Sequence, residues 1–253
     1  MDWGSLAGLA FGLSAIILGQ TLEGGSIESI LQPASLIIVL GGTLSAVLLQ
    51  NGIPNLLAGV RMLKRAFKPY DDFYNELTRS IHSWNSTARL EGMLKLDNLI
   101  SDYPDPFIAK GLRLVVDGVE VQKMREILEI DINSYEREQY RAIKVWDAAG
   151  GYAPTMGILG AVLGLSNVME NISSPDLLGQ GIATAFVSTI YGVGLANLIF
   201  LPIANKLKQH LQLEILKREM LADAFTSIRQ GEHPKLIQER LSSYRQSGAE
   251  HDA

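Results

Sequence analysis

The sequence contains no cysteine, and it has no lysine or arginine over two long stretches. Without cysteine there can be no disulfide framework, no thiolate metal site and no thiol nucleophile. The formal net charge is -5 at pH 7, and the chain has no basic stripe of the kind that binds nucleic acid. We therefore expect no nucleic-acid partner and no chemistry that depends on thiols.

Positive charge is missing before Arg61 and between Lys144 and Lys206. Within these stretches lie four apolar segments without Asp, Glu, Lys, Arg or His: residues 6–22, 31–49, 148–169 and 181–204. About 20 such residues cross a bilayer as a helix. The pattern predicts an all-α integral membrane protein with four transmembrane helices. The first segment could be a cleaved signal peptide, but Met1-Asp2-Trp3 lacks the positive start of one, so we expect a retained span.

The short loops predict an orientation, because positive residues stay on the cytoplasmic side of a membrane. Connectors 23–30 and 170–180 contain no Lys or Arg. Positive residues instead flank the other ends of the spans: Arg61, Lys64, Arg65, Lys68, Arg137, Arg141, Lys144, Lys206, Lys208, Lys217 and Arg218. We therefore predict a bacterial inner (cytoplasmic) membrane protein in contact with lipid, with both termini cytoplasmic and the two connectors in the periplasm.

The chain divides into four predicted regions: a first transmembrane pair (1–50), a helical cytoplasmic domain (51–147), a second transmembrane pair (148–204), and a cytoplasmic helix with a disordered tail (205–253). Residues 104–106 and 117–118 interrupt the middle region, which predicts several short helices and no sheet. The third span should continue without a break from a cytoplasmic helix that begins near Ile132. The fourth should extend to about Arg229, where Gly231 and Pro234 stop it, and the tail from Gln246 should be disordered.

The spans offer polar side chains but no titratable carboxylate or imidazole. Those of the third span include Thr155, Ser166 and Asn167, and those of the fourth include Thr184, Ser188, Thr189, Tyr191 and Asn197. Hydroxyls and amides can line a pathway or join neighbouring helices by hydrogen bonds, but they do not titrate near neutral pH. If protons cross the membrane here, their carrier belongs to another chain. The spans also offer no cluster that could hold a metal or act as acid and base, so we expect neither a cofactor nor an enzyme.

Two prolines and a set of small residues mark the last two spans. Pro154 and Pro202 lie near their predicted cytoplasmic ends and predict either fixed kinks or hinges. Small residues allow helices to approach closely, and we expect those of these spans to face a partner helix or a neighbouring subunit. They are Gly157, Gly160, Gly164, Gly181, Ala185, Gly192 and Ala196. In the cytoplasmic domain, Arg89 and Asp97 lie eight positions apart, on a solvated helix face if they have no other role.

Several of these residues lie in stretches that resemble the MotA/PomA flagellar stator proteins. Residues 150–165 read GGYAPTMGILGAVLGL, residues 188–192 read STIYG, and residues 196–204 read ANLIFLPIA. Supporting matches are LGGT at 40–43 and the segment from Arg89 to Asp97. The resemblance covers nearly the whole chain, in the same order and with the same predicted topology.

The resemblance implies a stator subunit of the bacterial flagellar motor. It implies a ring-forming homo-oligomer, which we expect to be pentameric, around a dimer of a single-span MotB/PomB-type partner whose membrane Asp receives the ion. Ion flow would then turn the ring against the rotor protein FliG. Arg89 and Asp97 match the charged residues of the family that face the rotor, and Pro154 and Pro202 match its two membrane prolines, which couple ion flow to shape change.

The resemblance also suggests the transported ion. Thr189 matches a threonine beside the ion path, and Ser188 and Tyr191 share its segment. Sodium-driven members usually pair that threonine with a second one, at the position that Ala161 occupies here. A dehydrated sodium ion needs oxygen ligands, whereas a proton that reaches a carboxylate through water does not. We therefore favour H+ and keep Na+ as the alternative.

Three other functions are compatible with parts of the sequence. An ExbB/TolQ-type energiser of envelope processes would share the last two spans, but such proteins usually have three spans and lack the segment from Arg89 to Asp97. A self-contained transporter is disfavoured because the spans lack charge for ionic solutes. A membrane enzyme is disfavoured because the cytoplasmic region has no phosphate loop or catalytic triad.

Overall fold

The computed structural model describes residues 3–68, 73–170 and 175–249, and every regular element in these ranges is helical. The α-helices are α1 (Trp3–Leu22), α2 (Pro33–Leu36), α3 (Gly42–Ala66), α4 (Phe73–Leu90), α5 (Asp97–Ile100), α6 (Pro106–Val116), α7 (Val121–Glu170), α8 (Pro175–Leu195), α9 (Leu201–Arg229) and α10 (Pro234–Ala249). Shorter elements are the 3-10 helices η1 (Ile27–Ser29) and η3 (Met93–Leu96) and the π-helices η2 (Ile37–Gly41) and η4 (Ala196–Phe200). The predicted all-α class is confirmed.

The chain forms two compact units, each made of two stretches of sequence. The first, here called the apolar unit, comprises Met1–Pro69 and Tyr140–Gln209. The second, here called the polar unit, comprises Tyr70–Gln139 and His210–Ala253. Among the residues that the structure describes, three helical segments are long and apolar enough to cross a membrane, namely Pro33–Ala66, Val121–Glu170 and Leu178–Arg229, whereas Leu6–Leu22 is a shorter apolar helix.

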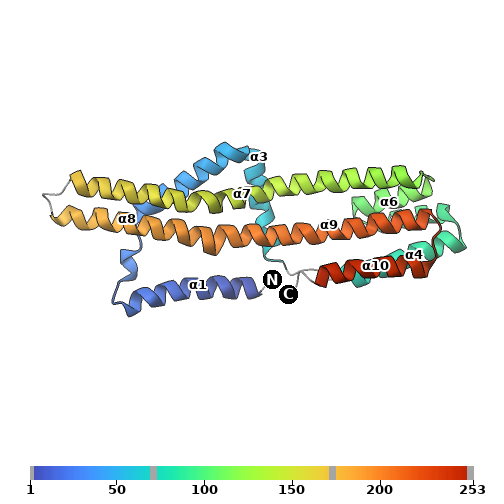
Figure 1. The fold of residues 1–253 in the computed structure, drawn as a ribbon, viewed down its shortest axis with the longest axis horizontal. Coiled ribbons are helices and arrows are strands. Elements are labelled where there is room, and N and C mark those ends of the chain that lie inside the picture. Colours follow the sequence, from blue (N-terminus) through green and yellow to red (C-terminus); the bar gives the residue numbers. More distant parts are fainter. Residues whose placement is uncertain (1–2, 69–72, 171–174, 250–253) are drawn as a thin grey trace. The chain divides into compact units, whose positions relative to one another are not determined.

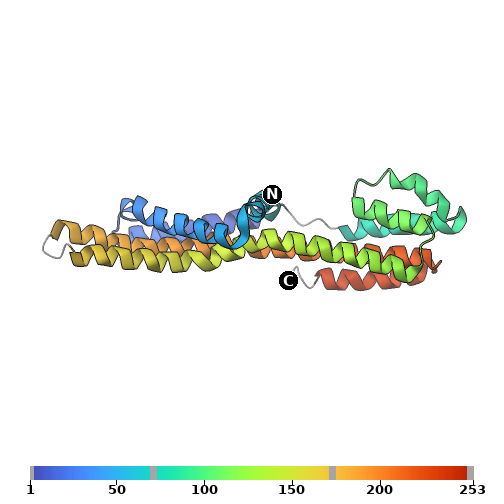
Figure 2. The same ribbon diagram turned by 90° about the horizontal axis from the view of Figure 1, so that it is seen from above.

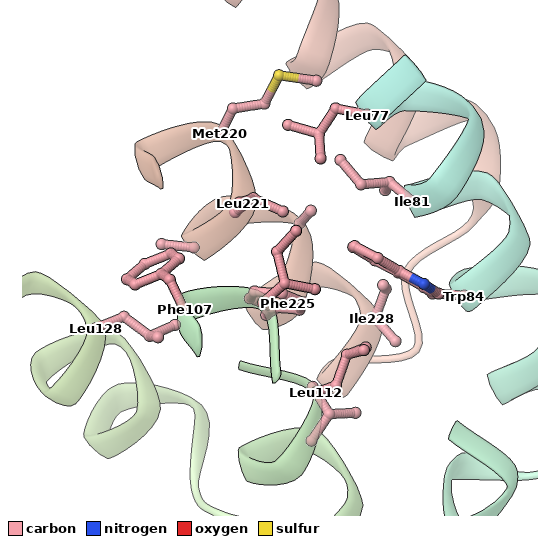
Figure 3. Close-up of a cluster of buried hydrophobic side chains, with 14 of the residues drawn as sticks. Leu77, Ile81, Trp84, Phe107, Leu112, Leu128, Met220, Leu221, Phe225 and Ile228 are labelled. Carbon is pink, nitrogen blue, oxygen red and sulfur yellow. The ribbon is translucent and has the colours of Figure 1, made fainter. Parts of the chain in front are cut away.

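The polar unit has a core of large side chains around an aromatic cluster (Figure 3). Trp84 of α4 is fully buried, stacks on Phe225 of α9 with ring centroids 5.6 Å apart, and meets the edge of Tyr103 at 5.1 Å. Phe225 fits because position 111 is glycine: a Cβ atom at Gly111 would lie 2.1 Å from the Phe225 ring. Such burial of apolar area is the main source of stability in water.

Local signals delimit the helices of the polar unit. The Asp105 side chain accepts a hydrogen bond from the Phe107 backbone N–H at 2.9 Å, and thereby caps α6. Gly118 follows the end of α6 with φ of 70°, which only glycine adopts readily. These are two of the interruptions predicted from the sequence. Helix α10 packs against α4 (Figure 1).

The apolar unit is built on a close pair of helices. Helix α8 lies alongside α7 (Figures 1 and 2). Glycines at the contact let the two backbones approach closely. A Cβ atom at Gly164 would lie 2.7 Å from the Ala185 nitrogen, and one at Gly192 would lie 2.6 Å from the Ala153 carbonyl oxygen. The small residues predicted to face a partner therefore pack helix against helix within one chain. The expectation that they face another chain was wrong, because the small residues of α7 pack against those of α8.

Helix α3 also packs against α7 within the apolar unit. The Trp146 indole N–H donates to the Gly59 carbonyl oxygen at 3.0 Å, and a Cβ atom at Gly59 would lie 2.8 Å from the Ala142 carbonyl oxygen. Helix α3 is interrupted at Gly52, whose φ of 72° and ψ of 164° are not helical. Pro54 follows two residues later, and the element is two helices joined at a kink.

Two predicted continuities are confirmed and one expectation is corrected. Helix α7 is one helix of 50 residues, so the helix expected near Ile132 does run without a break into the apolar segment 148–169. Helices α8, η4 and α9 follow one another without a gap and end at Arg229, before Gly231 and Pro234. However, α10 continues to Ala249, so the disorder expected from Gln246 is wrong for residues 246–249. Residues 250–253 lie outside the described residues.

Candidate functional site

The four predicted pathway residues lie in different surroundings. Thr189 is exposed on α8, and its hydroxyl donates to the Ala185 carbonyl oxygen at 3.3 Å. Ala161 on α7 is half-buried and has no polar side-chain atom. Ser188 is fully buried, and its hydroxyl has no hydrogen-bond partner within the described part of the chain. The structure brings Ser188 against Gly160, where a Cβ atom would lie 2.6 Å from its hydroxyl oxygen.

Tyr191, the fourth predicted pathway residue, has its hydroxyl engaged by the segment before α2. The hydroxyl donates to the Ile30 carbonyl oxygen at 2.6 Å and accepts from the Gln32 backbone N–H at 3.4 Å. Nearby, the Thr184 hydroxyl donates to the Gln32 side-chain oxygen at 2.8 Å, and the Ser35 hydroxyl donates to the Thr184 carbonyl oxygen at 3.1 Å. Sequence reasoning treated Thr184 only as a polar span residue and missed Gln32 and Ser35, because nothing in the sequence pairs positions about 150 apart.

The two prolines have different local geometry. Pro154 lies inside α7, which continues as one helix on both sides of it. Pro202 is the second residue of α9 and directly follows the π-helix η4. Because Pro202 has no N–H, the Leu198 carbonyl loses its usual helical hydrogen-bond donor. The i→i+5 hydrogen bonds of the π-helix η4 occur in the same stretch. Hinge and fixed kink both remain compatible with these geometries.

An ion pair joins α7 to α9 just outside the apolar segments. The Lys208 ammonium lies 2.8 Å from both carboxylate oxygens of Asp147, and both side chains are about one-third exposed. Asp147 is seven residues before Pro154, and Lys208 is six residues after Pro202. Sequence reasoning used Lys208 only for orientation and did not consider Asp147. The pairing joins positions 61 apart, so it becomes visible only when the helices are placed.

The predicted rotor-facing charges lie on the surface of the polar unit. Arg89 is near the end of α4, Asp97 begins α5, and both are exposed. Among the described residues they form no ion pair with each other. Gly92, with φ of 95°, lies between them at the start of η3. Leu90 and Leu94 are 85% and 77% exposed on the same turn, so the segment presents charged and apolar side chains together.

The polar unit also holds a cavity of about 360 Å³ that the sequence did not predict. It is lined by Arg125, Glu129, Ile132, Asn133, Glu219, Ala222, Asp223 and Tyr244. Burial, with the negative charges of Asp223 and Glu136, raises the pKa of Glu219. Burial and the hydrogen bond that its hydroxyl donates to Asp223 at 2.5 Å raise the pKa of Tyr244. Within the described ranges, no group of three or more His, Cys, Asp or Glu residues could hold a metal ion.

Two family models match this chain. Residues 6–92 match the motility protein A N-terminal model, and residues 100–220 match the MotA/TolQ/ExbB proton channel family. Motility protein A of Bacillus subtilis (strain 168) is 32% identical, with 96% of this chain and 91% of the relative covered. The chemotaxis protein PomA of Vibrio alginolyticus is 31% identical, with 98% of this chain and 97% of the relative covered.

Solved structures of flagellar stator complexes have the same fold. The flagellar MotAB stator complex of Bacillus subtilis matches with a TM-score of 0.85 and 32% identity over 95% of both chains. The MotAB structure of C. jejuni matches with a TM-score of 0.90 over 96% of both chains, and its 24% identity supports the fold alone. The relatives and the fold agree along almost the full length, so this chain belongs to the motility protein A family.

Proposed function

We propose that this chain is the stator subunit of a bacterial flagellar motor and that it forms an ion channel with a MotB-type partner. The observation that carries the proposal is the near-complete match, in sequence and fold, to the chain of a flagellar MotAB stator complex. The match to a motility protein A N-terminal model over residues 6–92 favours this function over an ExbB/TolQ-type role in the envelope. The family is one of channel subunits, and we assign no enzymatic activity to the chain.

Its membrane arrangement follows from the apolar helices and the positive residues around them. We place four spans in the inner membrane, with residues 6–22 as the shortest and both termini in the cytoplasm. The polar unit, whose core resembles that of a water-soluble domain, then lies in the cytoplasm. We further propose that the chain forms a pentameric ring around the partner helices. The many exposed apolar side chains of α1, α7 and α8 provide surfaces for lipid, neighbouring subunits and the partner.

Ion transfer in such a complex depends on a group that this chain does not supply. Its four apolar segments contain no Asp, Glu, Lys, Arg or His, so the acceptor is a carboxylate of the partner. Thr189 has an exposed hydroxyl on α8 that can hydrogen-bond to water in the pathway. At Ala161 the opposite helix offers no oxygen ligand. A sodium ion that loses its water needs several oxygens, so we favour H+ over Na+.

Coupling to the rotor requires shape change in the chain. We propose that Pro154 and Pro202 permit bending of α7 and α9, because a proline removes one backbone hydrogen bond from a helix. Lys208 and Asp147 connect the same two helices beyond both prolines, so bending on one side is transmitted to the other. Arg89 and Asp97 then contact the rotor protein FliG. Their exposure leaves both charged groups accessible to a partner protein.

Swimming tests the function and the ion separately. In a strain whose only stator contains this chain, deletion of its gene should abolish swimming while flagella still assemble. Loss of iron uptake or envelope integrity with normal swimming would instead favour the ExbB/TolQ-type function. With the chain present, swimming should persist without sodium and decrease with a protonophore. Swimming that depends on sodium and survives the protonophore would contradict the choice of H+.

A further inference from the structure

A set of polar contacts, here called the outer clamp, joins α2 and the segment before it to helix α8. It consists of Ile30, Gln32 and Ser35 on one side and Thr184 and Tyr191 on the other. Four hydrogen bonds connect them, with donor–acceptor distances of 2.6, 2.8, 3.1 and 3.4 Å. All five residues belong to the apolar unit, and Ser35 is fully buried.

The outer clamp satisfies backbone that no helix satisfies. Gln32 is extended, with φ of -115° and ψ of 106°, and it directly precedes the first residue of α2. Irregular backbone beside an apolar helix is tolerated only where its polar groups find partners. The Tyr191 hydroxyl provides two partners at once, because it donates to the Ile30 carbonyl and accepts from the Gln32 N–H. A phenylalanine at this position would leave these two backbone groups only the 3.0 Å hydrogen bond that the Gln32 N–H donates to the Ile30 carbonyl, and would remove their link to α8.

The outer clamp also determines which way α8 faces. Thr184 and Tyr191 are seven residues apart, about two helical turns, and therefore lie on one face of α8. Thr189 precedes Tyr191 by two residues, which places it about 160° away around the helix axis. Ser188 lies near the clamped side and packs against Gly160 of α7. With one face held by α2 and α7, Thr189 is directed to the opposite face, where its side chain is exposed.

We propose that Tyr191 is a positioning residue of the ion pathway and does not line it. Through Ile30 and Gln32 it fixes the rotation of α8, and this rotation keeps the Thr189 hydroxyl exposed toward the pathway. This inference rests on the proposed function, since Thr189 is assigned to the pathway there. It replaces the predicted role of Tyr191 as a pathway residue with a role at the opposite face of the same helix.

The absence of native cysteine makes the rotation directly measurable, because an introduced thiol is the only one in the chain. Thr189→Cys would be labelled with a water-soluble maleimide in membranes that contain the complex of this chain and its partner. Adding Tyr191→Phe should change the labelling rate about fivefold, a change equivalent to the net loss of one hydrogen bond. The matched control is Tyr140→Phe, because Tyr140 is 49% exposed and belongs to no outer-clamp contact.

Further variants separate positioning from a general loss of structure. Thr184→Val removes the hydroxyl that holds Gln32, and Gln32→Ala removes the side chain that it holds. Each should shift labelling in the same direction as Tyr191→Phe, and combining Thr184→Val with Gln32→Ala should add little to either alone. A purely structural role would lower the amount of folded chain without changing the labelling rate of the folded fraction. Gln32→Ala serves as the primary test if Tyr191→Phe fails to assemble.

Two outcomes overturn the inference. Labelling at position 189 that stays within twofold in both Tyr191→Phe and Gln32→Ala would show that the outer clamp does not set the rotation of α8. An equal shift in Tyr140→Phe would show that the effect is not specific to the clamp. Swimming is measured in parallel on the same variants without the introduced cysteine. A labelling shift in variants of a chain whose unsubstituted form supports no swimming would contradict the proposed function alone, and unchanged labelling in variants of a chain that does support swimming would contradict the clamp alone.

Discussion

The two units of this chain are packed by opposite means. The interior of the polar unit consists of large side chains such as Trp84, Phe225 and Met220, all fully buried. The interface between α7 and α8 in the apolar unit is built on glycine and other small residues, with backbones so close that a Cβ atom at Gly157 would lie 2.8 Å from the Ser188 carbonyl oxygen. The large apolar side chains of these two helices, such as Phe186 and Ile158, are exposed instead.

The difference follows from the solvent that each unit faces. In water, burying large apolar side chains provides the driving force, so they gather inside. In lipid, a buried leucine gains little over an exposed one, and helices associate through close van der Waals contact between small residues. The same chain can therefore place its leucines inside one unit and outside the other. If this comparison is correct, the two units should respond oppositely to the same kinds of substitution.

The largest expected effect is at the core of the polar unit. Trp84→Ala removes a fully buried ring that contacts Phe225 and Tyr103. It should lower the free energy of unfolding by about 3–5 kcal/mol, as for other large-to-small core substitutions. Thermal unfolding of the full chain in detergent, followed by the fluorescence of an introduced probe in the polar unit, measures this. Leu90→Ala is the control, since Leu90 is 85% exposed, and an equal loss in the control would contradict the comparison.

A smaller loss of stability is expected in the apolar unit, where the harmful substitution enlarges a residue. Gly192→Ala adds one methyl group where it would lie 2.6 Å from the Ala153 carbonyl oxygen. It should cost about 1–3 kcal/mol, because backbone cannot move aside as a side chain can. Gly194→Ala, two residues further along α8, has no atom within 4 Å of the added methyl group and should be neutral or slightly stabilising. Unfolding in detergent micelles compares the pair, and equal behaviour would refute close packing of α7 and α8.

The smallest effect concerns charge in the cavity of the polar unit. The pKa of Glu219 is raised by burial, Asp223 and Glu136, so its protonated form is favoured in the folded chain. Its contribution to stability is present below the ordinary pKa of 4.5 and is lost as the pH rises through the raised value. Glu219→Gln should therefore increase stability near pH 7 by about 0.5 kcal/mol, a magnitude typical of exposed charges that water screens. It should have no effect near pH 4.

The control for this pH dependence is Glu126→Gln on α7, because Glu126 is exposed and does not line the cavity. Unfolding midpoints of both variants, measured between pH 4 and pH 8, would show whether the dependence belongs to Glu219. A stabilisation by Glu219→Gln that is equal at all pH values would contradict the assigned cause.

The sequence predicts much of the fold because its patterns are local. Four charge-free stretches, an uninterrupted pattern from Ile132 into the third span, and the stops at Gly231 and Pro234 each concern neighbouring residues. The structure places long helices where those patterns predicted them. The end of α10 was mispredicted because a polar tail with few large residues resembles a disordered one, although Ile237 and Leu241 earlier in the helix are buried in the core of the polar unit.

The candidate site was less predictable, because its contacts join distant positions. Thr189, Pro154 and Arg89 were identified through resemblance, and their roles stay predictions. The partner of Tyr191 is 161 positions away, and that of Lys208 is 61 positions away. Which face of a span meets which neighbour depends on helix packing, and small residues alone do not distinguish contact within a chain from contact between chains. For that reason the glycines of α7 and α8 were assigned to the wrong neighbour.

The π-helix η4 also affects how sequences of this kind are to be aligned. A π-helix contains more residues per turn than an α-helix, so α9 begins with its faces rotated relative to an uninterrupted continuation of α8. Residues before Ala196 and after Phe200 that share a face are thus separated by one more residue than the usual spacing. A single-residue gap in an alignment is structurally neutral between these positions, whereas the same gap elsewhere in α8 would exchange its packed and exposed faces.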